Sequence, residues 1–109
     1  MACNCNDNNL ERVFTGTVLK LFLSPTATGF DAFQDNWEVE VRYGLGNVLA
    51  TYAKSDMIEG DGGHIAVIDT TGANGIMWAI VRAYVPDADC PGGIRTEVIS
   101  IDLCNIVNR

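Results

Sequence analysis

Residues 75–85 read Gly-Ile-Met-Trp-Ala-Ile-Val-Arg-Ala-Tyr-Val, and this run predicts a strand that is buried on both faces. The residues are apolar at both alternating positions until Arg82 and Tyr84 bring polarity to one edge. A glycine in front, Pro86 behind and the content of β-branched and aromatic residues favour a strand over a buried helix. We therefore expect a central strand with Trp78 in the core.

The composition predicts one soluble globular domain. Of 109 residues, 48% are hydrophobic and 19% charged, and no apolar run approaches the roughly 18 residues of a membrane span. We expect residues 10–109 to form a single domain and residues 1–9, rich in Asn and Cys, to be a flexible tail. The net charge of −7 disfavours contact with nucleic acid phosphates. The first residues carry no basic or apolar leader, so we expect a chain that is made and assembled in a cytosol, with no membrane partner.

Alternating hydrophobicity predicts about six strands and no long helix. They fall at residues 14–23, 37–43, 48–53, 64–69, 75–85 and 94–103. In the fourth strand we expect Ile65 and Val67 to face inward, and we expect that strand to pair with the central one. Residues 105–109 should trail off as a short tail. This count predicts an all-β fold, an antiparallel β-sandwich of immunoglobulin-like size with long loops.

The connections between these strands also carry expectations. Residues 24–36 form a long loop in which Phe30 and Phe33 should fold back as anchors. Glycines at 44 and 46 predict a tight hairpin turn. Residues 54–60 fit either a single helical turn or an irregular loop. Residues 86–93 are dense in turn formers and should make an exposed tip.

The sequence offers little catalytic or metal-binding chemistry. His64 is the only histidine, and its place at the start of a strand favours a structural role over that of a catalytic base. Cys3 and Cys5, together with Cys90 and Cys104, supply four thiols, but their spacing does not match a zinc site. We therefore expect no catalytic, cofactor-binding or metal-binding residues, and not an enzyme.

Candidate interaction residues lie in the tail and at the polar edge of the central strand. The tail could become ordered on a partner, and a small sandwich leaves sheet edges and an apolar surface that a second copy could cover. The residues that we single out for interaction are Cys3, Cys5, Asn8, Asn9, Arg82 and Tyr84.

The order of the strands resembles a family of phage proteins. A strand rich in Leu and Phe is followed by Val-Glu-Val-Arg-Tyr, Tyr-Ala-Lys-Ser, Gly-Gly-His-Ile-Ala-Val, the central run, and Ile-Arg-Thr-Glu-Val-Ile-Ser. This succession, over about residues 10–107, resembles the amino-terminal domain of phage baseplate upper proteins and the sandwiches of head-fibre proteins in crAss-like phages.

The resemblance implies a non-enzymatic structural protein of the virion that is assembled in the host cytoplasm. It leaves open a head fibre, a capsid decoration protein and an attachment or adaptor protein. The implied partners are other virion proteins of the capsid, fibre or baseplate, and the implied state is a homodimer or homotrimer. The alternative is a small glycan-binding β-sandwich module that uses Trp37 and Trp78 as a stacking platform, although the pattern places both rings in the core. A regulatory interaction protein without a virion role is a third reading.

Overall fold

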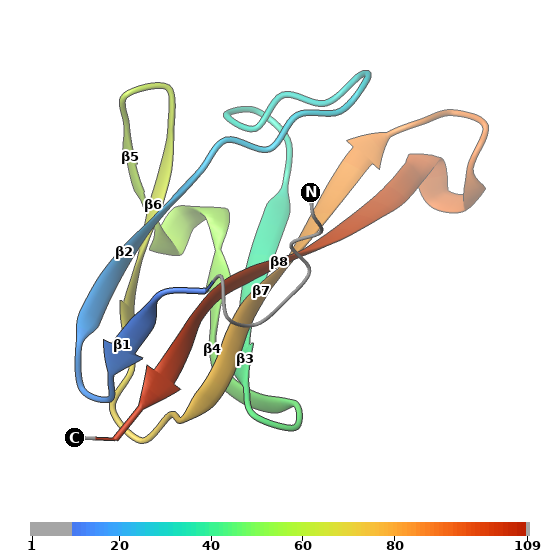
Figure 1. Cartoon of the computed structure of the whole chain (residues 1–109). Helices are drawn as coiled ribbons and strands as arrows, with labels where there is room; N and C mark the ends of the chain where they lie inside the picture. Colours follow the sequence, from blue (N-terminus) through green and yellow to red (C-terminus); the bar gives the residue numbers. More distant parts are fainter. Residues whose placement is uncertain (1–9, 109) are drawn as a thin grey trace, which may run out of the picture.

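The computed structural model describes residues 10–108, which form two β-sheets packed face to face (Figure 1). The strands are β1 (Arg12–Phe14), β2 (Val18–Leu23), β3 (Trp37–Tyr43), β4 (Asn47–Ala53), β5 (Ile58–Gly60), β6 (Gly63–Asp69), β7 (Gly75–Pro86) and β8 (Ile94–Val107). One sheet has the order β1-β8-β7-β3-β4 and the other β2-β6-β5. The short β1–β8 pairing is parallel and the others are antiparallel. The expected all-β sandwich is confirmed, with eight strands in the described residues instead of about six.

Strand β7 is the central strand of the larger sheet, as predicted, but only one of its faces is buried. It pairs with β3 along one side and with β8 along the other. Every second residue faces the smaller sheet and is at most 7% exposed: Met77, Ala79, Val81, Ala83 and Val85. Trp78 lies at the other parity and is half-buried on the outer face. The prediction that Trp78 belongs to the core was therefore wrong, whereas Trp37, at 2% exposure, does belong to it.

Ion pairs between neighbouring strands cover part of the outer face of β7. Arg82 lies between two carboxylates of β3, 3.6 Å from Glu38 and 3.3 Å from Glu40. Arg42 adds a contact of 3.1 Å to Glu40. The aliphatic stems of these side chains cover the apolar residues beside them. The outer face of β7, although largely apolar, is therefore half-buried and not fully exposed. The run at residues 75–85 is apolar on both faces because charged side chains of β3, together with Arg82, cover its outer face.

Strand β6 differs from the prediction in its sheet and in its buried face. It pairs with β2 and β5 in the smaller sheet and not with β7, because the turn at residues 70–75 crosses from one sheet to the other. Its buried residues are Ala66 and Ile68, whereas Val67 is 41% exposed. His64 shares the buried parity and packs edge-on against Trp37, with ring centroids 5.2 Å apart. The expected inward face of Ile65 and Val67 was thus wrong by one residue.

The opening strand of the prediction is two strands that belong to different sheets. Gly16, with φ of 95°, lies in the turn that separates β1 from β2. Buried Thr70 holds this turn: its Oγ1 donates to the Thr17 carbonyl at 2.7 Å and accepts from the Gly16 amide at 3.0 Å. The Thr70 hydroxyl therefore links the β1–β2 connection to the β6–β7 connection, and both connections cross from one sheet to the other.

The last strand runs longer than predicted. Residues 105–107 continue β8 and pair in parallel with β1, so the expected tail from residue 105 was wrong. Cys104 and Ile106 are buried there, at 3% and 1% exposure. A bulge near Leu103, opposite the step from Met77 to Trp78, keeps both halves of β8 in register with β7.

The long loop at residues 24–36 is fixed by the core. The indole Nε1 of Trp37 donates to the Ala32 carbonyl at 2.9 Å, and Lys54 Nζ reaches the Phe33 and Asp35 carbonyls at 3.2 and 2.8 Å. Phe30 packs against the core as expected, whereas Phe33 remains 41% exposed. Within residues 54–60 a helical turn is present as the 3₁₀ turn η2 (Lys54–Asp56), but Ile58–Gly60 form strand β5, which was not expected. A second 3₁₀ turn, η3 (Pro91–Gly93), lies in the exposed tip. Among the described residues no helix is long and apolar enough to cross a membrane.

Replacing each tryptophan by alanine should separate the two faces of the larger sheet. Trp37→Ala should lower the free energy of unfolding by about 3–5 kcal/mol, because it empties a fully buried site and removes the indole bond to the loop. Trp78→Ala should cost about 1–2 kcal/mol, because its ring is already partly in water. Urea unfolding followed by far-UV circular dichroism measures both losses. Equal losses would contradict the assignment of the two faces.

Candidate functional site

Most of β8 forms an edge of the larger sheet. Strand β1 pairs only with residues 105–107, and no described strand pairs with the outer side of β8 from Ile94 to Asp102. Figure 1 shows the turn end of the β7–β8 hairpin projecting beyond the smaller sheet. An exposed strand edge is a template for another strand, because its N–H and C=O groups lack ladder partners.

The hydrogen bonds of β7 identify which groups of β8 face this edge. The Gly44 amide donates to Ile76 and the Tyr84 amide to Asn36, each at 3.0 Å, so even-numbered residues of β7 bond with β3. Odd-numbered ones therefore bond with β8, and the Asp87 amide, which donates to Gly93 at 2.9 Å, follows the same rule. In the register of the β7–β8 pair, the backbone groups that point away from β7 are those of Ile94, which directly follows the η3 turn, and of Thr96, Val98, Ser100 and Asp102. We call the last four residues the open edge.

Apolar side chains lie along both faces of this strand. Val98 on the outer face is 60% exposed, and Ile99 and Ile101 on the inner face are 57% and 37% exposed. Natural edge strands are commonly protected by proline, lysine or charges pointing inward. Strand β8 has one inward charge, Glu97, whose carboxylate is held by Arg95 at 2.9 Å, and none of these protections between Val98 and Ile101. The open edge therefore combines unpaired backbone groups with an apolar stretch, residues 98–101, that is unprotected.

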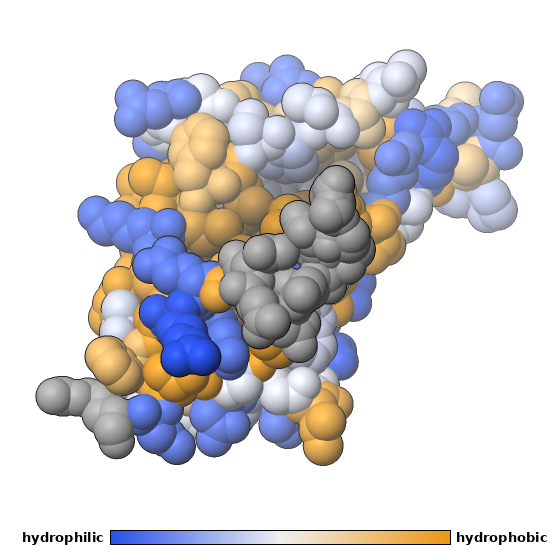
Figure 2. Space-filling view, in the orientation of Figure 1, coloured by the Kyte–Doolittle hydropathy of each residue, from blue (hydrophilic) through white to orange (hydrophobic). Residues whose placement is uncertain are grey.

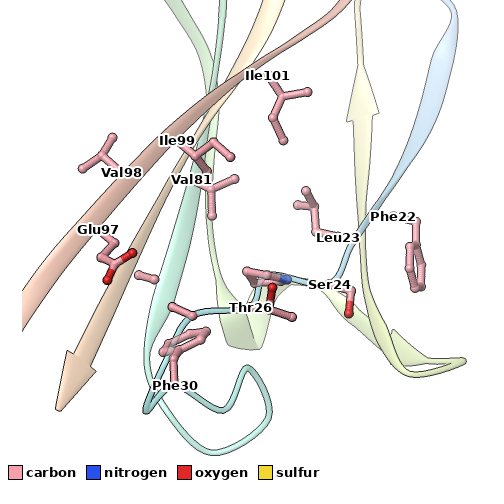
Figure 3. A pocket seen from close by; sticks show the side chains of 13 residues that line it. Phe22, Leu23, Ser24, Thr26, Phe30, Val81, Glu97, Val98, Ile99 and Ile101 are labelled. Atoms are coloured by element: carbon pink, nitrogen blue, oxygen red, sulfur yellow. The ribbon is translucent and has the colours of Figure 1, made fainter.

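A groove of about 400 Å³ opens beside this strand. Figure 3 shows Ile99, Ile101 and Val81 on one wall, with Leu23 facing them from β2 and Phe30 at one end. The groove exists because β2 ends at Leu23 while β7 and β8 continue, so no strand covers the inner face of β8 at this height. Figure 2 shows apolar surface over the upper part of β2 and polar side chains on the projecting end of the hairpin.

The opposite side of the sandwich is closed. There the chain passes from β4 through η2 to β5, and Met57 on this path is 8% exposed. The Tyr52 hydroxyl of β4 also donates to the Val67 carbonyl of β6 at 2.9 Å, which joins the two sheets directly. Burial, followed by the charge of Asp69, raises the pKa of Tyr52, so this hydroxyl remains a donor at neutral pH. The asymmetry between the two sides places the apolar groove beside β8.

Charged groups hold the base of the hairpin tip. Arg95 donates to Asp87 through its guanidinium and to Glu97 at 2.9 Å through Nε. The bond from the Asp89 amide, and then the bond from Arg95, lower the pKa of Asp87. The hydrogen bonds to Glu97 and Asp87 raise the pKa of Arg95. This cluster orders the end of β8 that lies next to the open edge.

The predicted interaction residues are only partly described. Cys3, Cys5, Asn8 and Asn9 lie outside the described residues. Arg82 and Tyr84 are half-buried on the outer face of β7, directly opposite Val98 and Thr96 of β8. Burial and the neighbouring Glu38 raise the pKa of Tyr84, which stays neutral and able to donate. Both residues thus lie one strand away from the open edge.

The chemically reactive side chains do not converge. No group of three or more His, Cys, Asp or Glu side chains among residues 10–108 could hold a metal ion. Cys90 lies in the tip and Cys104 near the base of the hairpin, about 30 Å apart by the rise of a strand. His64 is 2% exposed, with Nε2 3.7 Å from Glu59 and Nδ1 without a hydrogen-bond partner among the described residues. Burial, followed by the charge of Glu11, raises the pKa of the Cys104 thiol.

The open edge was not among the residues predicted to interact. The sequence shows that the last strand is apolar at both alternating positions, at Val98, Ile99, Ile101 and Leu103, and this is the signal that could have indicated it. That signal also fits a strand buried on both faces. Only the sheet order, with a partner strand β1 of three residues, distinguishes an open edge from a buried strand.

Comparison with known proteins gives no relative: no protein family model, no curated protein and no solved structure matches this chain.

Acidification should release the hairpin tip. Because the pKa of Asp87 in the folded chain lies below its ordinary value of 3.8, the carboxylate stabilises the tip above that pH, and this contribution is lost as the pH falls through the lower, folded value. Backbone NMR relaxation of residues 88–93 should show no increase in motion above pH 3.8. Motion should increase once the pH falls through the folded pKa of Asp87, which lies below 3.8. Asp87→Asn should show the increased motion at neutral pH as well. A titration of Asp87 at or above 3.8 would contradict this account.

Proposed function

We propose that this chain is a non-enzymatic structural protein of a phage virion and that it assembles through the open edge of β8 and the adjoining groove. The candidate roles are head fibre, capsid decoration protein, and attachment or adaptor protein. The partners are other copies of the chain and other virion proteins of the capsid, fibre or baseplate. Assembly takes place in the host cytoplasm.

The observation that carries this proposal is the unprotected edge beside an apolar groove. Strand addition is a common mode of assembly, since main-chain hydrogen bonds supply affinity and alternate side chains supply specificity. The four residues of the open edge offer the backbone groups, and Ile99 and Ile101 offer the side chains on the groove side. A surface of this kind suits a protein whose work is to bind other protein chains.

Two further features support a structural role. The net charge of −7 repels packaged nucleic acid, which suits a protein on the outside of a particle. The only histidine of the chain is enclosed by Phe33 and Trp37, at ring distances of 5.0 and 5.2 Å, where its side chain serves packing. The resemblance in strand order to phage baseplate and head-fibre sandwiches then indicates which kind of assembly is involved.

A glycan-binding module remains the second candidate, and one observation favours it. Trp78 lies on the outer face of the larger sheet and not in the core, with Arg42 and Asp102 as its neighbours on the adjacent strands. A partly exposed ring flanked by polar groups offers an apolar face on which a sugar can stack. Quenching of tryptophan fluorescence by glycans, absent in Trp78→Ala, would favour this candidate over the first.

Mass spectrometry of purified particles tests the proposed function. The protein should be present in intact virions, in a fixed ratio to the major capsid protein, and should stay with them through a density gradient. Particles from a phage with an early stop codon in this chain provide the control. Absence from gradient-purified virions would contradict the proposal.

A further inference from the structure

We infer that the open edge of β8 pairs with the same edge of a second copy, so that two larger sheets join antiparallel across a twofold axis at Ile99. This inference rests on the proposed function in one respect, since it names the occupant of the same edge. Its test needs only purified protein, whereas the proposed function is tested on particles. The two can therefore fail independently.

The open backbone groups are arranged symmetrically about one residue. Thr96, Val98, Ser100 and Asp102 are centred on Ile99, two residues on each side. An antiparallel copy related by a twofold axis at Ile99 places Val98 opposite Ser100 and Thr96 opposite Asp102 of the second copy. Each of these pairs exchanges two hydrogen bonds, so the four pairs satisfy all of the open groups in both copies with about eight bonds. An axis at Ser100 leaves Thr96 without a partner. An axis at Val98 pairs Asp102 with Ile94, but on the inner face it sets Glu97 and Arg95 of each copy opposite Ile99 and Ile101 of the other.

The side chains agree with this register. On the inner face Ile99 meets its own copy in a pair that is not hydrogen-bonded, where side chains approach closely. On the outer face the Thr96 hydroxyl can donate to the Asp102 carboxylate of the second copy. Glu97 falls beside Ile101 of the second copy, but its carboxylate is held at 2.9 Å by Arg95 of its own chain. No like charges lie opposite each other, although the chain carries a net charge of −7.

The groove is covered by the same pairing. Ile99 and Ile101 of the second copy point to the inner face of the joined sheet, on the side where Phe22 and Leu23 of β2 lie. Apolar surface that a single chain leaves open is thereby removed from water in both copies. Closed twofold symmetry is the most frequent arrangement of identical subunits, and it ends the sheet edge instead of propagating it into a fibril.

The neighbouring strand delimits the contact. Strand β1 uses the same side of β8 from Asn105 onward, where the Asn105 amide donates to the Glu11 carbonyl at 2.9 Å. The bulge near Leu103 separates this part from the open edge. A second copy therefore begins where β1 ends, and the pairing includes residues 96–102 and no more.

Disulfide trapping tests the axis. In the full chain with Cys3, Cys5 and Cys90 replaced by serine, Ile99→Cys should form a crosslinked dimer on mild oxidation, because the two sulfur-bearing residues face each other at a distance that a disulfide spans. Ser100→Cys is the matched control: it faces Val98 of the second copy and should crosslink at least tenfold more slowly. Efficient crosslinking of Ser100→Cys would overturn the proposal, and so would the absence of crosslinking in both variants.

Sedimentation equilibrium from about 1 to 100 μM, the range in which a modest interface forms, supplies the second measurement. The native chain should be a dimer at the upper end, and Ile99→Lys should be a folded monomer, because it sets two ammonium groups opposite each other at the axis. Val48→Lys, on the other edge of the same sheet and 51% exposed in the native chain, should dimerise unchanged. A monomeric native chain, or loss of the dimer in Val48→Lys and not in Ile99→Lys, would overturn the inference.

Deletion of residues 1–9 completes the test. The truncated chain should dimerise with an unchanged dissociation constant. If it dimerises only after this deletion, the edge is occupied by the chain's own amino terminus and the inference is wrong. If Ile99→Lys fails to fold, Ser100→Pro replaces it, since the amide of Ser100 points to the open edge and its loss removes no bond to β7.

Discussion

The pairing of β7 with β8 is the constraint on which the rest of the structure depends. These strands have 12 and 14 residues, whereas the longest strand of the smaller sheet has 7. Where the two sheets overlap, alternate residues of β7 form the centre of the core, and Met77 and Ala79 are fully buried there. On β8, directly beside these core residues, the same alternation leaves Ile99 and Ile101 facing a groove. The core and the candidate assembly surface are thus two parts of one strand pair.

This arrangement explains why one side of the sandwich is sealed and the other is not. The Tyr52 hydroxyl and the η2 turn join the sheets on the side of β4, while on the side of β8 the short strand β1 covers only residues 105–107. A domain of about this size buries roughly two thirds of its unfolded surface, so an uncovered apolar strand is a substantial part of what remains. Edges of this kind are normally protected, and lack of protection indicates a partner.

The sequence predicted the longer strands and most of their boundaries, because alternation in residues 37–43 and the apolar run at residues 75–85 are local signals. It missed β5 and joined β1 and β2 into one strand. It failed where the outcome depended on which sheet a strand joins. Trp78 looked like a core residue because nothing local shows that Arg82 and the carboxylates of β3 would cover its face. Strand β6 was assigned the wrong inward face because His64, a polar residue, takes a buried place beside Trp37. The sequence predicted that sheet edges exist but not which strand is open, since that depends on the length of β1 and on the sheet order.

Amide hydrogen exchange measured residue by residue across β8 tests the central claim most directly. The claim predicts a period of two in the Ile99→Lys variant, where amides that bond with β7, at residues 97 and 101, exchange slowly and those at Thr96, Val98 and Ser100 exchange quickly. In the native chain at high concentration all of them should exchange slowly, because a second strand then accepts the outward amides. Slow exchange at Thr96, Val98 and Ser100 in the variant as well would show that the chain covers its own edge and would contradict the account.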